Sequence, residues 1–283
     1  LFKLRGEWQG SKGEPFDIKG TILYMCSLSA IMIGGTLIGK FDYSLLLLLA
    51  GFMGFFFFFL YESNTKFPLI NTSILTHNLR FTFNNLATLI NYAASFGTLF
   101  LFSLYLQEIK FYSAQKAGFI LICQPLIQAA IAPLAGRLAD RFPPAIIATC
   151  GMLLCTIGLG ISTFITSSSP IIFILAILLI MGAGFGLFSS PNMVAIMGSV
   201  GPKLFGVASG VVATMRSLGM LVSMAMITVI IGNIIGEQSI THSNKQLFIS
   251  VMKLSFLSFS ILSLIGTLLS IAKDIRNIVE KKS

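Results

Sequence analysis

Charged residues are scarce in this sequence. Only 10% of the 283 residues are Asp, Glu, Lys or Arg, whereas 55% are hydrophobic. A soluble globular domain carries roughly 25% charged residues, so this chain has too little polar surface to stay dissolved. Its long apolar runs must therefore face lipid, which excludes a soluble domain and predicts an integral membrane protein.

Groups that could perform catalysis or bind a metal are also few. A multispan membrane enzyme should cluster His, Asp, Glu or Cys near the membrane interface, and no such cluster is visible, so we expect no catalytic residue and no cofactor. The two histidines, His77 and His242, fall in polar stretches. The cysteines lie inside apolar runs without CxxC or Cys/His spacing, so we expect buried thiols with neither disulfide nor metal. They are Cys26, Cys123, Cys150 and Cys155.

The net charge of +9 does not indicate a nucleic-acid partner. Nearly all Lys and Arg lie between apolar runs, and no basic patch is interleaved with aromatic residues. Such a distribution is typical of membrane topology, in which short cytoplasmic loops collect basic residues. The lipid bilayer is therefore the expected partner.

Runs of about 20 apolar residues predict spanning helices. Alternating segments of about ten residues, which are typical of a membrane β-barrel, are not visible. We therefore predict an all-α membrane protein with about eight transmembrane helices. The predicted spans are 20–38, 43–61, 80–106, 117–136, 144–165, 170–190, 206–231 and 249–271. Most Lys and Arg then lie on the side of both chain ends, which predicts that both termini are cytoplasmic.

One charge falls well inside a predicted span. Arg216 occurs in Ala213-Thr-Met-Arg-Ser-Leu-Gly219. A charged side chain near the bilayer centre costs roughly 2.5–3.5 kcal/mol, so such residues usually face a cavity or a partner. The alternative is that the long helix places Arg216 near the cytoplasmic interface, where it snorkels. None of the ten acidic residues lies near the middle of a span.

Polar amides form a second pattern. Asn84, Thr88, Asn91 and Ser95 recur at helical spacing, which places them on one face, with Tyr92 adjacent. Such faces either join helices or line a water-filled path, and joining helices is the commoner role. The further candidates are Gln124 and Gln128, four residues apart around Pro125, and Asn192 after Pro191. A path rich in amides and poor in acids favours neutral or cationic amphipathic substrates over inorganic ions.

Small residues form a third pattern, in Gly182-Ala-Gly-Phe-Gly186 and in Gly206-Val-Ala-Ser-Gly210. GxxxG spacing lets helix backbones approach closely, so packing explains both stretches, and a gating role stays open.

A short charged turn is expected between the spans 117–136 and 144–165. It contains Gly136, Arg137, Asp140 and Arg141 and ends in Phe142-Pro143-Pro144. Asp140 is expected just before the next helix, where its N-terminus favours a carboxylate. A solvated positive-inside loop is the alternative.

This string, Gly136-Arg-Leu-Ala-Asp-Arg141, resembles the loop signature of the major facilitator superfamily. Other stretches are similar to the 14-spanner drug/proton antiporter branch of EmrB and QacA type, and together they cover nearly the whole chain in family order. They are 16–20, 104–107, 133–141, 191–192, 206–210 and 216–219. The chain departs from the pattern at Phe142, where family loops usually carry Gly, and the prolines that follow predict a stiffer turn.

The resemblance implies a domain order and a mechanism. Residues 1–19 would be a cytoplasmic segment, 20–61 two linking helices, 62–79 a cytoplasmic loop, 80–271 a C-terminal six-helix bundle and 272–283 a cytoplasmic tail. The chain begins with Leu rather than Met and shows no signal peptide, so we expect a partial chain lacking an N-terminal six-helix half. It implies proton-coupled export of small amphipathic molecules by alternating access, with the proton-carrying acid in that half. Uptake, or a non-transporting membrane partner, is the alternative.

Overall fold

A computed structural model describes residues 17–37, 43–65, 78–236 and 245–280. Eight of its helices, counted over these residues, are long and apolar enough to cross a membrane, which confirms the predicted number. The elements are α1 Ile18–Thr36, α2 Tyr43–Ser63, α4 Leu79–Ser95, α5 Gly97–Leu104, the π-helix η1 Tyr105–Ile109, α6 Ala114–Leu121, α7 Cys123–Arg141, α8 Pro144–Ser162, α9 Ile171–Met197, the 3₁₀ turn η2 Pro202–Leu204, α10 Phe205–Ile234 and α11 Lys245–Glu280. α4, α5 and η1 form one span, and α6 and α7 form another. His77 and His242 lie outside the described residues.

Short polar side chains begin several of these helices. Asp17 accepts a hydrogen bond from the backbone N–H of Gly20 at 2.9 Å, and Asn78 accepts one from that of Phe81 at 3.0 Å. The first N–H groups of a helix have no partner within it, so these side-chain caps define where α1 and α4 start.

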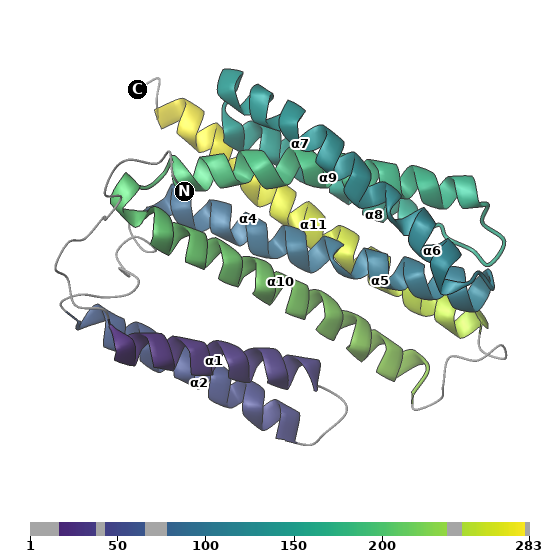
Figure 1. Cartoon of the computed structure of the whole chain (residues 1–283), viewed down its shortest axis with the longest axis horizontal. Helices are drawn as coiled ribbons and strands as arrows, with labels where there is room; N and C mark the ends of the chain where they lie inside the picture. Colours follow the sequence, from purple (N-terminus) through teal and green to yellow (C-terminus); the bar gives the residue numbers. More distant parts are fainter. Residues whose placement is uncertain (1–16, 38–42, 66–77, 237–244, 281–283) are drawn as a thin grey trace, which may run out of the picture.

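α9 packs between α7 and α8 (Figure 1). A Cβ atom at Gly182 would lie 2.5 Å from the carbonyl oxygen of Gln124 on α7. On the other side, a Cβ atom at Gly151 of α8 would lie 2.7 Å from the carbonyl oxygen of Gly184. The glycines of 182–186 therefore let two neighbouring backbones reach α9 at once, which is the packing role predicted for them.

Hydroxyl groups join α8 to α11. The side chains of Thr149 and Ser270 hydrogen-bond at 2.6 Å, and those of Thr156 and Ser263 do so at 2.8 Å. α11 also packs on α4, so the long apolar helices are joined by a few specific polar contacts as well as by shape.

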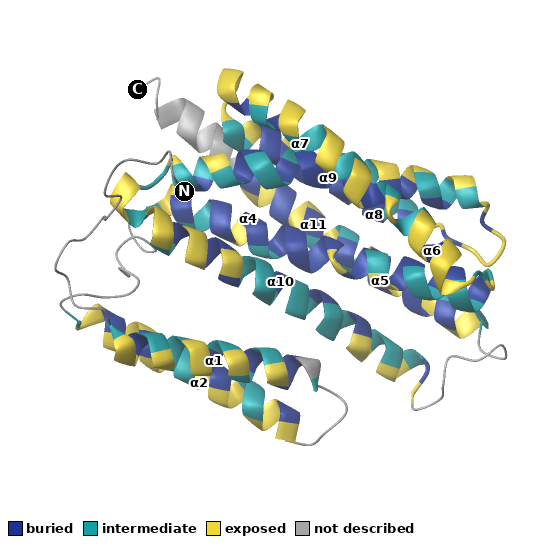
Figure 2. Ribbon diagram, in the orientation of Figure 1, coloured by how far each residue is buried: buried dark blue, intermediate teal, exposed yellow. Residues whose placement is uncertain are grey.

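α1 and α2 form a hairpin that lies beside α10, apart from the other helices (Figure 1). The hydroxyl of Tyr24 on α1 hydrogen-bonds to that of Thr214 on α10. The ring of Tyr24 also packs against Phe58, which is fully buried, whereas Phe56 and Phe57 are exposed. Figure 2 shows exposed residues along much of the hairpin, as expected for helices that face lipid.

Two of the predicted helices extend past their expected ends. α9 continues through Pro191 to Met197, seven residues beyond the expected end. Proline is tolerated inside a membrane helix when neighbouring helices compensate for the lost hydrogen bond. α11 extends from Lys245 to Glu280, past the expected limits at both ends.

Pro125 interrupts the regular helix a few residues before its own position. The break between α6 and α7 falls at Ile122. Proline has no N–H to donate to the carbonyl four residues back, which here belongs to Leu121, so regular helix cannot run through this point.

The cysteines are less buried than expected. Cys155 is buried and Cys123 is intermediate, but Cys26 and Cys150 are exposed on the helix surface. An apolar run predicts that a residue lies within the membrane, but it does not decide whether that residue faces protein or lipid.

Candidate functional site

A cation and an aromatic ring meet where α10 crosses α4. The guanidinium carbon of Arg216 lies 5.1 Å from the ring centroid of Tyr92. One turn away, a Cβ atom at Gly219 would lie only 2.5 Å from the carbonyl oxygen of Leu89, so the two backbones nearly touch. That close approach holds the guanidinium over the ring, in the geometry of a cation–π contact.

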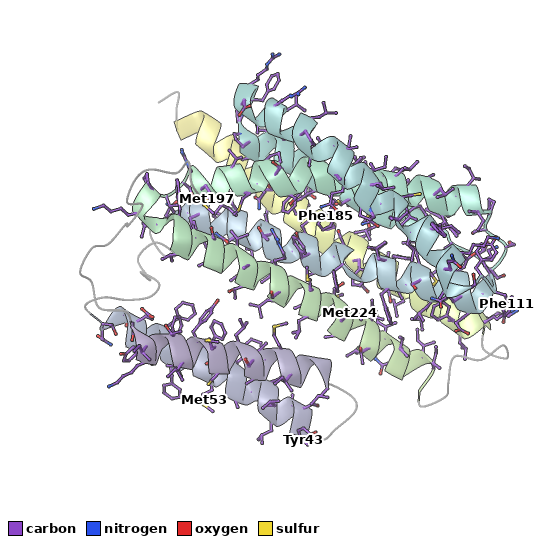
Figure 3. The ribbon with its side chains drawn as sticks, in the orientation of Figure 1. Tyr43, Met53, Phe111, Phe185, Met197 and Met224 are labelled. Atoms are coloured by element: carbon purple, nitrogen blue, oxygen red, sulfur yellow. The ribbon has the colours of Figure 1, made fainter. Side chains whose placement is uncertain are left out.

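α9 supplies the third side of this site. The ring of Phe185 stands edge-on to that of Tyr92, with centroids 5.2 Å apart and an interplanar angle of 87°. Phe185 lies near the middle of the bundle (Figure 3). Tyr92 also interacts with the side chain of Ser189, one turn further along α9. The aromatic pair therefore fixes the surface on which Arg216 rests.

Arg216 is only half-buried, and its hydrogen bonds are not all used. Its Nε atom is buried and has no hydrogen-bond partner among the described residues. A buried guanidinium N–H without an acceptor is costly. The site therefore holds an unpaired guanidinium N–H beside an aromatic face.

Asn192 joins helices. Its amide nitrogen donates to the hydroxyl of Thr88 at 2.8 Å and to the carbonyl oxygen of Asn84 at 3.3 Å. All three residues are buried. This contact ties α9 to α4, which is the commoner of the two roles considered for a polar face.

No described contact joins the other amide candidates to Arg216. Asn91, although next to Tyr92 in sequence, is 0% exposed. Gln124 is buried and Gln128 is half-buried, and the backbone carbonyls of both lie against glycines of α9. The helical face predicted from 84 to 95 therefore exists, but it points into protein and lines no open path in this structure.

The residues of the expected charged turn are helical. Gly136, Arg137, Asp140 and Arg141 all belong to α7, so Asp140 lies in a last turn and does not precede the next helix as expected. The apolar run ended before the helix did, because helical hydrogen bonding continues into the polar surface layer. The three charged side chains are exposed, and within the described part of the chain no ion pair joins them to another residue.

Sequence reasoning missed the contributions of Phe185 and Ser189, which carry no distinctive motif. It also missed Glu62, which is only 2% exposed at the end of α2 and lies near Gly20 and Asp17 of α1. No spacing signal relates residues so far apart. Across the described residues, no group of three or more His, Cys, Asp or Glu side chains could hold a metal ion.

Comparison with known proteins adds a family. The sequence model described as Major Facilitator Superfamily matches residues 85–282. The chain is 28% identical to the riboflavin transporter RibZ of Clostridioides difficile, over 83% of this chain and 50% of that protein. It is 29% identical to the uncharacterized transporter YebQ of Escherichia coli, over 62% and 38% respectively. It is 22% identical to the multidrug resistance protein Stp of Mycobacterium tuberculosis, over 76% and 41%. The chain thus spans about half or less of the length of these relatives.

Proposed function

The chain belongs to the major facilitator superfamily, and from this premise we propose that it is the C-terminal part of a proton-coupled exporter of small amphipathic molecules. The chain is a multi-pass membrane protein of a transporter family and not an enzyme. Export, proton coupling, substrate and assignment to the 14-spanner drug antiporter branch are proposed.

The observation that carries the proposal is the contact between Arg216 and Tyr92. It places a guanidinium with one unsatisfied N–H beside two aromatic rings within membrane-spanning helices. Such a surface suits a planar amphipathic molecule, which can stack on Tyr92 and present an acceptor to Arg216. Two named relatives support this substrate class, since one is a riboflavin transporter and another a multidrug resistance protein.

Gating is assigned to the end of α7. Arg137, Asp140 and Arg141 are exposed on its last two turns. In the whole transporter they would form ion pairs with neighbouring helices when the cytoplasmic side closes, and release them when it opens. Alternating access of this kind is rigid-body rocking of one helical half against the other.

Proton coupling is assigned to residues outside this chain. Each described acidic residue lies at or near an end of a helix, so none is placed to carry a proton at mid-membrane. We propose that an N-terminal six-helix half supplies that acid, that α1 and α2 link the halves, and that both ends of this chain are cytoplasmic. Uptake by the same fold is the runner-up, and a non-transporting partner is the third reading.

The test is substrate efflux by the full-length transporter in everted membrane vesicles, with riboflavin and cationic dyes as substrates. Arg216→Ala should reduce efflux roughly tenfold or more. It removes both the cation–π contact with Tyr92 and the proposed hydrogen bond to the substrate, and a desolvated cation–π contact contributes about 2 kcal/mol. Arg216→Lys should retain part of the activity, and Lys203→Ala, at an exposed site, should retain all of it. Asp140→Asn should also reduce efflux.

Unchanged efflux in Arg216→Ala would contradict the assignment and favour a snorkelling side chain. Proton-driven efflux from vesicles that contain only these 283 residues would contradict the placement of the coupling acid elsewhere. In everted vesicles export appears as accumulation of substrate in the lumen, so a loss of preloaded substrate from the lumen under the same proton gradient would favour the uptake reading.

A further inference from the structure

Three polar side chains on the α4–α5 span are buried more deeply than any substrate could reach. Asn91 is 0% exposed, Ser95 is 1% and Thr98 is 0%. Their spacings of four and three residues place them on one face of the helical span, over about 10 Å along its axis. They form a continuous polar strip inside the bundle, and we call it the α4 polar strip.

The polar atoms of the strip have few protein partners. Both side-chain atoms of Asn91 and the hydroxyl oxygen of Thr98 are buried without a hydrogen bond to any described residue. Ser255, which is 0% exposed on α11, has the same property. The buried hydroxyl of Ser95 meets the thiol of Cys155, which is a weak hydrogen-bonding group. Many other helical hydroxyls donate to the carbonyl four residues earlier, as Thr88, Thr149, Thr156, Ser162 and Thr267 do.

The strip faces the interior of the bundle, not lipid and not Arg216. Thr88, at the same helical face, accepts a hydrogen bond from Asn192 of α9. Ser95 lies beside Cys155 of α8. One turn beyond Thr98, the ring of Phe102 meets that of Phe256 on α11, the neighbour of Ser255, at 5.3 Å. The strip is therefore enclosed by α8, α9 and α11.

Leaving a buried amide or hydroxyl unpaired costs more free energy than a hydrogen bond gains, and native proteins pair nearly all such groups. We propose that the α4 polar strip is a binding site for a small cluster of ordered water molecules. A buried water usually makes about three hydrogen bonds to otherwise unsatisfied groups. The amide, with two donors and one acceptor oxygen, and the adjacent hydroxyls supply those partners.

Water fits this site better than a cation. The strip offers neutral oxygen atoms, and α4, α5, α8 and α9 contain no Asp or Glu. A desolvated sodium ion would lack a compensating negative charge, and Arg216 on the neighbouring α10 adds a positive one. Asn91, predicted from the sequence as a contact on the substrate pathway, is thus assigned to water. The inference does not depend on the substrate or on the direction of transport.

The test is X-ray hydroxyl-radical footprinting of the full chain in nanodiscs, read by mass spectrometry, because water near a buried side chain generates the radical that oxidises it. Cys155, beside Ser95, should be oxidised although it is 0% exposed. Phe58, equally buried in the α1–α2 hairpin, should remain unmodified.

Thr98→Val keeps the shape and removes the hydroxyl. It should lower the oxidation of Cys155 several-fold and lower the thermal midpoint by a few degrees, whereas Thr98→Ser should preserve both. Thr156→Val, which removes a hydroxyl bonded to Ser263, should leave the oxidation unchanged.

Three results would overturn the proposal. An unmodified Cys155 in the unaltered chain would show that no water lies at the strip. This measurement needs no variant, so it tests the proposal even if Thr98→Val fails to fold. A higher thermal midpoint in Thr98→Val shows that the hydroxyl was unpaired. A midpoint that rises with sodium but not with N-methylglucamine, at equal ionic strength, assigns the strip to a cation.

Discussion

α9 and α10 carry the same small-residue pattern, yet the bundle uses it in only one of them. In α9, Gly182 and Gly184 meet the backbones of α7 and α8. In α10, Gly206 and Gly210 are exposed, and no described atom lies within 4 Å of a Cβ built at either. GxxxG spacing permits close packing, but a partner must be present to make it.

The difference extends to the polar residues of the two helices. Asn192 of α9 has its amide bonded to α4, so it stabilises the bundle. Arg216 of α10 keeps an unbonded Nε and rests on an aromatic ring. The polar side chain of α9 is therefore used in packing, whereas that of α10 keeps an N–H group without a partner among the described residues.

The largest effect on folding should come from filling the packed glycine. Gly182→Val would drive its Cβ atom to 2.5 Å from the Gln124 carbonyl oxygen, which is backbone and cannot move aside. We expect a loss of about 1–3 kcal/mol or more, seen as a lower thermal midpoint and a lower yield of monodisperse protein. A stability equal to that of the unaltered chain would show that α7 and α9 do not pack this closely.

A smaller effect should follow from Asn192→Leu. It removes two hydrogen bonds between α9 and α4 while keeping the volume of the side chain. Hydrogen bonds between membrane helices contribute about 0.6–1.7 kcal/mol, so the thermal midpoint should fall less than in Gly182→Val. Asn192→Asp, which retains an acceptor but loses the donor, separates the role of the amide N–H from that of shape. No change in either variant would remove the structural role given to this residue.

The smallest effect should come from Gly210→Ala on α10. Nothing described lies near the added methyl group, and alanine favours helix over glycine by about 1 kcal/mol. The thermal midpoint of this chain should stay equal or rise slightly, measured beside Gly182→Ala as the matched change on α9. A clear destabilisation would mean that α10 packs through Gly206 and Gly210 as well as through Gly219, and would end the contrast between the two GxxxG stretches.

The sequence predicted which types of residue form the candidate site, but not which of them contact one another. A lone arginine in an apolar run signals a special environment whatever the fold, because its burial is expensive. Phe185 and Ser189 give no such signal, since aromatic and hydroxyl residues are common in membrane helices. Asn192 and Asn91 look alike in the sequence, yet the amide of Asn192 joins two helices, whereas that of Asn91 has no hydrogen-bond partner among the described residues.

The sequence by itself determined that the helices lie in lipid, how many spans there are and which family the chain resembles. Lipid requires about 20 apolar residues per helix and satisfied backbone hydrogen bonds, so composition and run length suffice for those conclusions. Only the tertiary structure decided which glycines are packed, which cysteines face lipid and which polar residues meet across helices. The physical reason is that lipid and protein interior are equally apolar, so hydrophobicity does not distinguish the two faces of a membrane helix. The sequence singled out Arg216 because a charge inside a membrane span costs free energy. Its position over Tyr92 follows from the close crossing of α10 and α4 at Gly219.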